Sequence, residues 1–220
     1  IDLKSLNNVR IKNERLLCFY NSIIYNGKVL SNDTYKDESK VKYYDVNELI
    51  AAKEGEAPAV TELDIIQKQK INFVLAKDGN VYTLESADNG CNIVKIKNDF
   101  TLEKVFANFQ PAKGPYHSSP TIGMVASETE NIIYLVSTDG AIYKYILGDS
   151  DSLKAPFIAA ESGVSITAPL QLNQQSGELY VTYTEERKDE SKIVVYSKDG
   201  KVLHTVDCGE SVPSQILFNN

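Results

Sequence analysis

The chain contains no tryptophan, one methionine, two histidines and three cysteines among its 220 residues. Few of the usual zinc ligands are therefore present, and no C-x-x-C pair occurs, so we expect no metal cluster. Cys18, Cys91 and Cys208 lie far apart in the sequence. Two interpretations stay open. Either all three are free thiols on strands, or two form a disulfide and the third is free.

Long apolar runs and an excess of basic residues are also missing. No apolar run approaches the about 20 residues that cross a bilayer as a helix, so we expect no direct insertion into a membrane. The 30 acidic and 23 basic residues give a net charge of −7. Because nucleic-acid binding depends on a basic surface, we expect no nucleic-acid partner. No signal peptide is visible, and we interpret the start at Ile1 as processing or trimming.

The apolar residues, 42% of the chain, are enough for a sizeable core and occur in short runs separated by polar turns. The pattern is clearest from Ala168 to Cys208, which contains four such runs: Pro169–Leu172, Glu178–Thr184, Lys192–Ser197 and Lys201–Asp207. Partial alternation of apolar and polar residues is typical of strands with one buried face. This stretch therefore predicts a four-stranded antiparallel meander. A single short helix is predicted over Asn47–Glu56, with Asn47 as its cap.

Elements of this meander recur along the chain. Aliphatic–Tyr pairs occur in the predicted second strands of three units, at Val81-Tyr82, Ile133-Tyr134 and Leu179-Tyr180. The pentamer Lys-Asp-Glu-Ser-Lys occurs at 36–40 and again at 188–192, and Asp-Gly turns occur at Asp78-Gly79, Asp139-Gly140 and Asp199-Gly200. Four-stranded units at a period of about 50 residues are the sequence signature of a β-propeller. A β-sandwich, the alternative, gives no reason for the repeat.

The predicted fold class is therefore all-β, a β-propeller made of four-stranded antiparallel blades, with about four blades and a partial one in this chain. The predicted blades span about residues 9–66, 71–107, 118–159 and 168–208, and the first strand of a further blade spans 213–218. We interpret the chain as one propeller domain or a fragment of one, with blades missing on at least one side. A small closed ring is the alternative.

The third unit carries a resemblance to a known family. Ser118-Ser119-Pro120, followed by Ile133-Tyr134, Asp139-Gly140 and Ile142-Tyr143, resembles the repeat of quinoprotein-like (PQQ-like) propellers. The resemblance covers most of the chain and is specific for the fold. Members that bind the quinone use a tryptophan-containing docking motif, so the absence of tryptophan places this chain with the non-cofactor-binding branch. That resemblance implies that the chain binds no cofactor. It also implies an extracytoplasmic location, in the periplasm, at the cell surface or outside the cell.

Candidate ligand-binding residues lie in the loops that enter the innermost strands, because these loops open on the face where propellers usually bind ligands. The candidates are Tyr116, His117, Ser118, Ser165, Thr167, Glu210 and Ser211. In the alternative interpretation His117 only caps a turn shaped by the neighbouring prolines. His204 is expected at the surface of an outer strand, and the charged loops Lys36–Lys40 and Glu185–Lys192 are expected to be solvated tips. No catalytic, metal or cofactor residue is predicted, and Asn32-Asp33-Thr34 fits a glycosylation acceptor.

The leading hypothesis for function is a non-enzymatic binding or scaffold module that presents loops to a protein, peptide or glycan. The alternative is a propeller hydrolase or lyase that acts on polysaccharide or peptide, with His117 as acid or base. A third hypothesis is a structural part of a larger assembly. In each case the remaining blades of the same parent chain are also expected partners.

Overall fold

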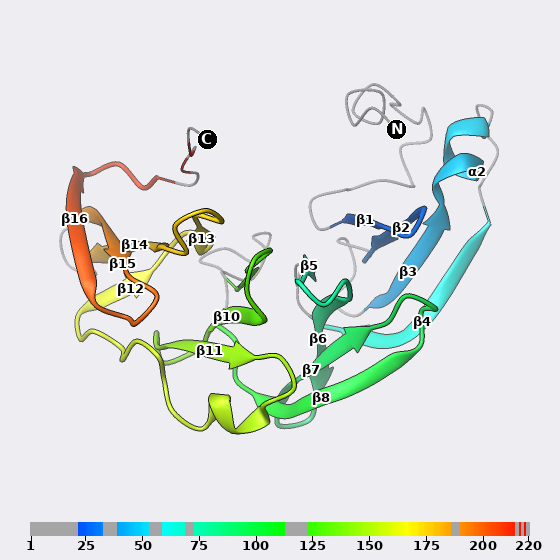
Figure 1. The fold of residues 1–220 in the computed structure, drawn as a ribbon, viewed down its shortest axis with the longest axis horizontal. Helices are drawn as coiled ribbons and strands as arrows, with labels where there is room; N and C mark the ends of the chain where they lie inside the picture. Colours follow the sequence, from blue (N-terminus) through cyan, green and yellow to red (C-terminus); the bar gives the residue numbers. More distant parts are fainter. Residues whose placement is uncertain are drawn as a thin grey trace. The chain divides into compact units, whose positions relative to one another are not determined.

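The computed structural model describes residues 22–32, 39–52, 59–68, 73–112, 123–185, 190–213, 216 and 218. In these residues the chain consists almost wholly of antiparallel strands (Figure 1). It divides into two compact units, Ile1–Lys70 and Ile71–Asn220. Within the described part of the chain, no helix is long and apolar enough to cross a membrane.

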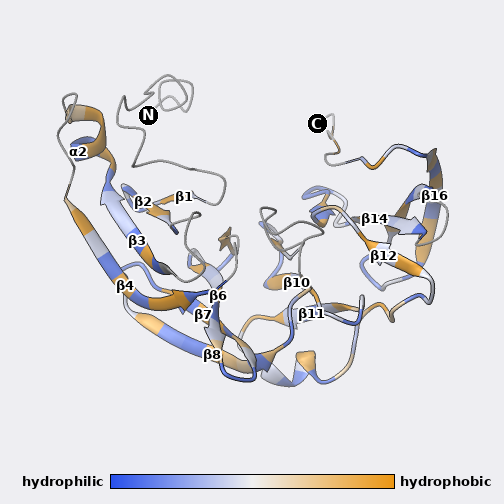
Figure 2. Ribbon diagram, turned by 180° about the vertical axis from the view of Figure 1, so that it is seen from behind, coloured by the Kyte–Doolittle hydropathy of each residue, from blue (hydrophilic) through white to orange (hydrophobic). Residues whose placement is uncertain are grey.

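The first unit contains one four-stranded sheet in the order β1-β2-β3-β4. Its strands are β1 (Ile23–Tyr25), β2 (Lys28–Ser31), β3 (Ser39–Asp45) and β4 (Val60–Gln67). Asn26 and Gly27 form the tight turn between β1 and β2, and both have positive φ (46° and 72°), as a type I′ hairpin requires. Apolar and polar residues alternate along part of β4 (Figure 2), because one face of the strand is buried.

The helix of the first unit, α2, spans Val46–Ala51 and follows β3 directly. The prediction of Asn47 as its cap is wrong, because Asp45 at the end of β3 caps the helix. The Asp45 carboxylate accepts hydrogen bonds from the backbone amides of Asn47 (2.8 Å) and Glu48 (3.2 Å). Val46 and Leu49 of the helix pack on Val29 of the sheet. Residues 53–58, which include the predicted end of the helix, lie outside the described residues.

Asp45 gives the first unit a stability that depends on pH. The hydrogen bond from Lys28 (2.8 Å), followed by those from the helix amides, lowers the pKa of Asp45. The stabilisation is therefore present above the unfolded-state pKa of about 4 and is lost as the pH falls through the lower folded-state pKa. We expect Asp45→Asn, which keeps a capping oxygen, to unfold at lower urea than the wild type near neutral pH. The two urea midpoints converge toward about pH 3, and a constant difference would contradict this account.

Asn32, the predicted glycosylation acceptor, is buried at the end of β2. Its side-chain amide donates a hydrogen bond of 2.6 Å to Oε1 of Gln67 in β4. A glycan on this nitrogen would replace that bond and would need space in the protein interior. The structure therefore argues against Asn32 as an acceptor in the folded chain.

The second unit begins with a four-stranded sheet in the order β5-β6-β7-β8. Its strands are β5 (Val74–Leu75), β6 (Val81–Ala87), β7 (Gly90–Ile96) and β8 (Leu102–Phe109). The predicted first strand of this unit included residues 71 and 72, which lie outside the described residues. Hairpin turns join the consecutive strands, so the sheet is the predicted meander.

The next sheet has three strands in the order β11-β10-β9, and a single bridge replaces the fourth. Its strands are β9 (Met124–Ala126), β10 (Ile132–Val136) and β11 (Ile142–Ile146). Beyond β11 the chain forms a short 3₁₀ helix, η2 (Ser150–Leu153), which Asp149 caps. Only Ile158, near the end of the predicted blade 118–159, then pairs with Ile142. Short polar residues such as those of Asp149–Ser152 favour such local turns over a strand.

The last sheet has the order β12-β14-β15-β16, and β13 also pairs with β14. Its strands are β12 (Val164–Ile166), β13 (Gln171–Leu172), β14 (Leu179–Glu185), β15 (Ser191–Tyr196) and β16 (Val202–Gly209). The innermost strand is thus split, because β12 pairs with the end of β14 and β13 pairs with its start. Residues 167–170 bulge between them, where Pro169 has no N–H to give to a ladder. The sequence predicted one inner strand, Pro169–Leu172.

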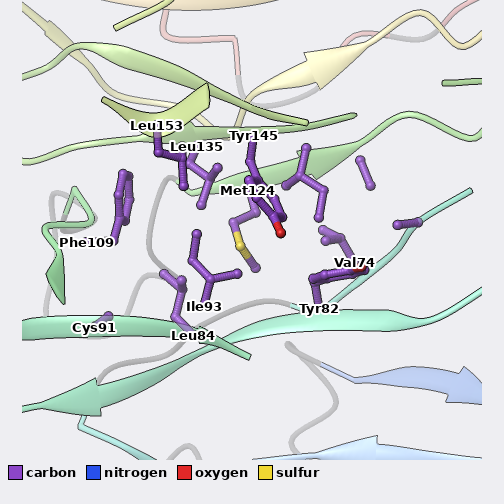
Figure 3. Close-up of a cluster of buried hydrophobic side chains, with 13 residues drawn as sticks. Val74, Tyr82, Leu84, Cys91, Ile93, Phe109, Met124, Leu135, Tyr145 and Leu153 are labelled. Carbon is purple, nitrogen blue, oxygen red and sulfur yellow. The ribbon is translucent and has the colours of Figure 1, made fainter. Parts of the chain in front are cut away.

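The three sheets of the second unit pack face to face. Residues of β10 alternate, so that Ile133 and Leu135 join one apolar cluster while Tyr134 and Val136 join another. The first cluster joins the β9–β11 sheet to the β5–β8 sheet, and Figure 3 shows Met124 and Leu135 directed toward Ile93. The second cluster joins the β9–β11 sheet to the β12–β16 sheet. The middle sheet therefore buries both faces, as a blade between two blades does.

The repeats of the sequence occupy unequal structural positions. Each aliphatic–Tyr pair lies at the start of a second strand, in β6, β10 and β14, so this repeat marks equivalent sites. The Asp-Gly turns do not mark equivalent sites. They join β5 to β6, β10 to β11 and β15 to β16, which are the first, second and third hairpins of their respective sheets. An Asp-Gly pair suits any tight turn that needs a residue with positive φ, so it is a weaker marker of the repeat.

Cys91 and Cys208 are free thiols, and Cys18 lies outside the described residues. Burial, with a smaller effect of the Glu85 charge, raises the pKa of Cys91 to about 11. Cys208 is only partly buried. Since the thiolate is the reactive form, we expect iodoacetamide to modify Cys208 in the folded chain but Cys91 only after denaturant is added. Peptide mass spectrometry measures both rates, and equal rates for the two cysteines would contradict the burial of Cys91.

Candidate functional site

Four strands of the last sheet reach the same end of that sheet, which we call the loop end. The cross-strand pairs Val164–Glu185, Thr184–Ser191 and Ser191–Gly209 define it. β12 and β15 begin at this end, whereas β14 and β16 finish there. The predicted charged loop 185–192 also opens at this end, although residues 186–189 lie outside the described residues.

The structure places Ser165 and Thr167 at the loop end, but not in the loop that the sequence predicted. Ser165 is an exposed residue of β12 and lies opposite Thr184 of β14. Thr167 follows β12 in the bulge, and its backbone amide donates a hydrogen bond of 3.2 Å to the carbonyl of Thr182. Both residues are thus held by backbone pairing rather than by a free loop.

Glu210 and Ser211 lie at the same end, directly after β16, and both are exposed. The Ser211 amide donates to the carbonyl of Cys208 (3.2 Å), which turns the chain away from the sheet. The structure thus brings Ser165, Thr167, Glu210 and Ser211 to one end of one sheet. The other three candidates, Tyr116, His117 and Ser118, lie outside the described residues.

A row of hydroxyl groups runs from the bulge after β12 across β14 to β15 at the loop end. The hydroxyls of Thr167 and Thr184 lie 2.8 Å apart, and those of Thr184 and Ser191 lie 2.9 Å apart. Ser191 is buried, whereas Thr167 and Thr184 are half-buried. The sequence analysis missed Thr184 and Ser191, because only the register of β14 with β15 shows that they face each other. A hydroxyl can donate one hydrogen bond and accept two, so the row keeps capacity for a ligand.

A charged pair lies near this end, and a pair of tyrosines lies on one face of β14 and β15. Nζ of Lys192 is 3.0 Å from Oε1 of Glu161 and 5.9 Å from the ring centroid of Tyr183. The hydroxyls of Tyr183 and Tyr196 lie 3.1 Å apart in the interior. Burial is the largest cause that raises the pKa of Tyr183, so its phenol stays protonated at physiological pH. This pair can therefore hold a hydrogen bond but does not exchange protons near neutrality.

The ionisable groups with shifted pKa values elsewhere in the second unit serve turns and packing. Burial of Asp78 opposes ionisation, but hydrogen bonds from Lys95, Asn80 and Tyr82 together lower the pKa of Asp78. These bonds, which include a 2.8 Å ion pair with Lys95, fasten the β5–β6 turn to the sheet.

The other polar groups that could take part in chemistry also have structural roles or lie at the surface. The Ser137 hydroxyl donates to the carboxylate of Asp139, which also accepts from the amide of Ala141 and so shapes the β10–β11 turn. His204 is exposed on β16, opposite Val195. In the part of the chain that the structure describes, no three His, Cys, Asp or Glu residues are grouped to hold a metal ion. The hydroxyl row of the loop end offers hydrogen-bond donors and acceptors.

A family model described as a domain of unknown function, DUF5074, matches residues 23–219. The chain belongs to this family. A comparison of the DUF5074 chain with curated proteins finds no match. The family match covers the four sheets and all candidate residues named above.

The DUF5074 chain is also similar to solved structures. Puromycin hydrolase aligns with a TM-score of 0.54 and 14% identity, over 86% of this chain and 28% of that protein. Apo prolyl oligopeptidase B from Galerina marginata aligns with a TM-score of 0.52 and 12% identity, over 88% of this chain and 27% of that protein. The DUF5074 chain thus spans less than a third of either structure. The likeness shows the fold, an all-β propeller type built of four-stranded antiparallel sheets.

Proposed function

We propose that the DUF5074 chain is a non-enzymatic binding module whose loop end takes a hydrogen-bonding partner, a glycan or a peptide. The observation that carries the proposal is the row of Thr167, Thr184 and Ser191, beside the exposed Ser165. The polar uncharged groups at the loop end can bind hydroxyl-rich sugars or peptide amides, which also donate and accept hydrogen bonds.

The ion pair near the loop end does not compete with a ligand for the hydroxyl row. Lys192, on the opposite face of β15 from the hydroxyl row, already has a carboxylate partner in Glu161. This ion pair is partly exposed and contributes little to stability. An uncharged ligand could bind the hydroxyl row without desolvating either member of the pair.

The names of the similar structures suggest the competing function, hydrolysis. Puromycin hydrolase and prolyl oligopeptidase B are several times longer than the matched region, so their activities do not transfer to this chain with the fold. A nucleophile needs a base within hydrogen-bond reach, whereas the Thr184 hydroxyl lies within reach of the hydroxyls of Thr167 and Ser191. Hydrolysis with His117 as acid or base is therefore the outcome against which the proposal is tested.

A glycan array and a peptide library, probed with the intact chain, test the proposal. We expect Thr167→Val, which removes the hydroxyl but keeps the volume, to weaken the retained ligand by about tenfold or more. Ser176→Ala, in the β13–β14 turn at the opposite end of the sheet, is the matched control and should bind as the wild type does. Retention of no ligand, or equal loss in both variants, would overturn the proposal.

We also propose that the repeat is related to that of quinoprotein-like propellers, in the non-cofactor-binding branch. Two positions support this relation, since Ile133-Tyr134 opens the second strand of its sheet and Asp139-Gly140 turns it into the third. The extracytoplasmic location implied by that branch is part of the same proposal. Fractionation of cells that express the full parent protein tests it, and recovery only with the cytosol would contradict it.

A further inference from the structure

β16 is the outer strand of the last sheet and pairs with β15 on one side only. Figure 1 shows no strand along its other side, and every residue of β16 except Cys208 is exposed. Three of the nine exposed large hydrophobic residues in the described part of the chain lie on it: Val202, Leu203 and Val206. The outer edge of β16 therefore combines free backbone groups with apolar side chains.

The outer strands of the two four-stranded sheets, β4 and β8, carry several charged side chains, unlike β16. Glu62 and Asp64 of β4 each lie 3.6 Å from a lysine of β3. Glu103 and Lys104 of β8 form ion pairs at 2.9 and 3.4 Å. Charged residues on an outer strand deter pairing with another chain. The ion pairs between described residues include none from β16.

Irregular pairing does not distinguish β16 from the other outer strands. Register shifts occur where β3 pairs with β4, where β7 pairs with β8, and at two places where β15 pairs with β16. On β16 these shifts fall next to Leu203 and Cys208, which leaves His204–Asp207 in regular pairing. β16 carries one charged residue, Asp207, and takes part in none of the ion pairs between described residues, and this rather than a lack of bulges sets it apart.

The charges that flank this segment favour one arrangement. Lys201 precedes the strand and Asp207 lies near its end. When two copies of β16 run antiparallel, the Lys201 end of each lies beside the Asp207 end of the other, so opposite charges meet at both ends. A parallel pair would bring like charges together. The antiparallel pair is also the arrangement that a two-fold symmetric dimer produces.

We propose that β16 is a docking edge for a second copy of this chain, which adds its own β16 in antiparallel orientation. The pair forms backbone hydrogen bonds along the regular segment and covers Val206 of both copies. One pair of strands buries less than the about 1,200 Å² of a stable interface. The net charge of −7 on each copy also opposes association. The dimer is therefore a concentration-dependent equilibrium.

Analytical ultracentrifugation across a range of concentrations tests this edge. The weight-average mass should rise from 24.4 kDa toward twice that value. Val206→Lys should weaken the dimer by about tenfold or more, because it places a charged side chain in the apolar contact between the two strands. Val60→Lys on β4 is the matched control, since Val60 and Val206 are 49% and 52% exposed. A monomer at every concentration, or equal effects of the two variants, would overturn the proposal.

A charge exchange tests the orientation. Lys201→Glu should weaken the dimer, because it places two carboxylates near each other at both ends of the strand pair. The double variant Lys201→Glu/Asp207→Lys restores opposite charges and should recover the wild-type dimer. Failure of the double variant to recover association, while the wild type dimerises, would overturn the antiparallel arrangement.

Discussion

Ile133→Ala is expected to lower the free energy of unfolding of the second unit by about 2–5 kcal/mol. Ile133 lies in β10 and is 0% exposed, within the cluster that joins the β9–β11 sheet to the β5–β8 sheet. Its truncation removes apolar contacts and leaves a cavity between two sheets, and both effects destabilise the packed state. Urea unfolding followed by circular dichroism measures the change.

The matched control is Ile146→Ala on the neighbouring strand β11. Ile146 is 43% exposed, so the same truncation should cost less than about 1 kcal/mol. A similar loss in the two variants would show that the β9–β11 sheet does not bury this face against the β5–β8 sheet. The account of stacked sheets would then be wrong.

Gly90→Ala is expected to lower the free energy of unfolding by about 2–4 kcal/mol. Gly90 opens β7 with φ of +125°, in a region that residues with a side chain rarely adopt. A Cβ at this position would lie 2.6 Å from the backbone oxygen of Phe109 and would also clash with Nε2 of Gln110. It would also displace Gln110 from its 2.6 Å hydrogen bond to the carbonyl of Asn89.

Gly148→Ala separates the effect of backbone conformation from that of crowding. Gly148 also has positive φ (+86°), but a Cβ there would have no heavy atom within 4 Å. We therefore expect Gly148→Ala to lower the free energy of unfolding by only about 1–2 kcal/mol, because only the unfavourable backbone conformation contributes. Thermal unfolding of both variants gives the comparison, and equal midpoints would contradict the close approach of residues 109 and 110 to Gly90.

The sequence predicted most strands because their signals are local. The Asn-Gly pair at 26 and 27 favours a tight turn, and the short run that follows it, Lys28–Ser31, is β2. The Lys-Asp-Glu-Ser-Lys repeat also lies between a second and a third strand in both copies, because β3 and β15 begin at its Ser residues. Turn chemistry and apolar runs act within a few residues, so they can be read without the fold.

The features that the sequence did not predict depend on contacts between distant residues. β12 forms because Val164–Ile166 meets the end of β14, and a three-residue strand has no periodic pattern of its own. Asp45 rather than Asn47 caps α2, because β3 continues up to the helix and leaves Asp45 in extended conformation.

The same limit applied to the candidate site. Ser165 and Thr167 were found from their place before an inner strand, but their partners were not. Thr184 lies 17 residues beyond Thr167 in the sequence and becomes its neighbour only through the pairing of β12 with β14. The positions of these residues in the sequence predicted which end of the sheet they occupy. The hydroxyl row could be found only from the register of the paired strands.

The most direct test of the proposed function is the mass of a bound ligand after prolonged incubation with the intact chain. The ligand retained on the array is mixed with equimolar protein and followed by mass spectrometry, beside a His117→Ala variant. Binding without chemistry predicts an unchanged ligand mass with both proteins. A product that forms with the wild type and disappears with His117→Ala, while the variant remains folded, would contradict the binding module and establish an enzyme.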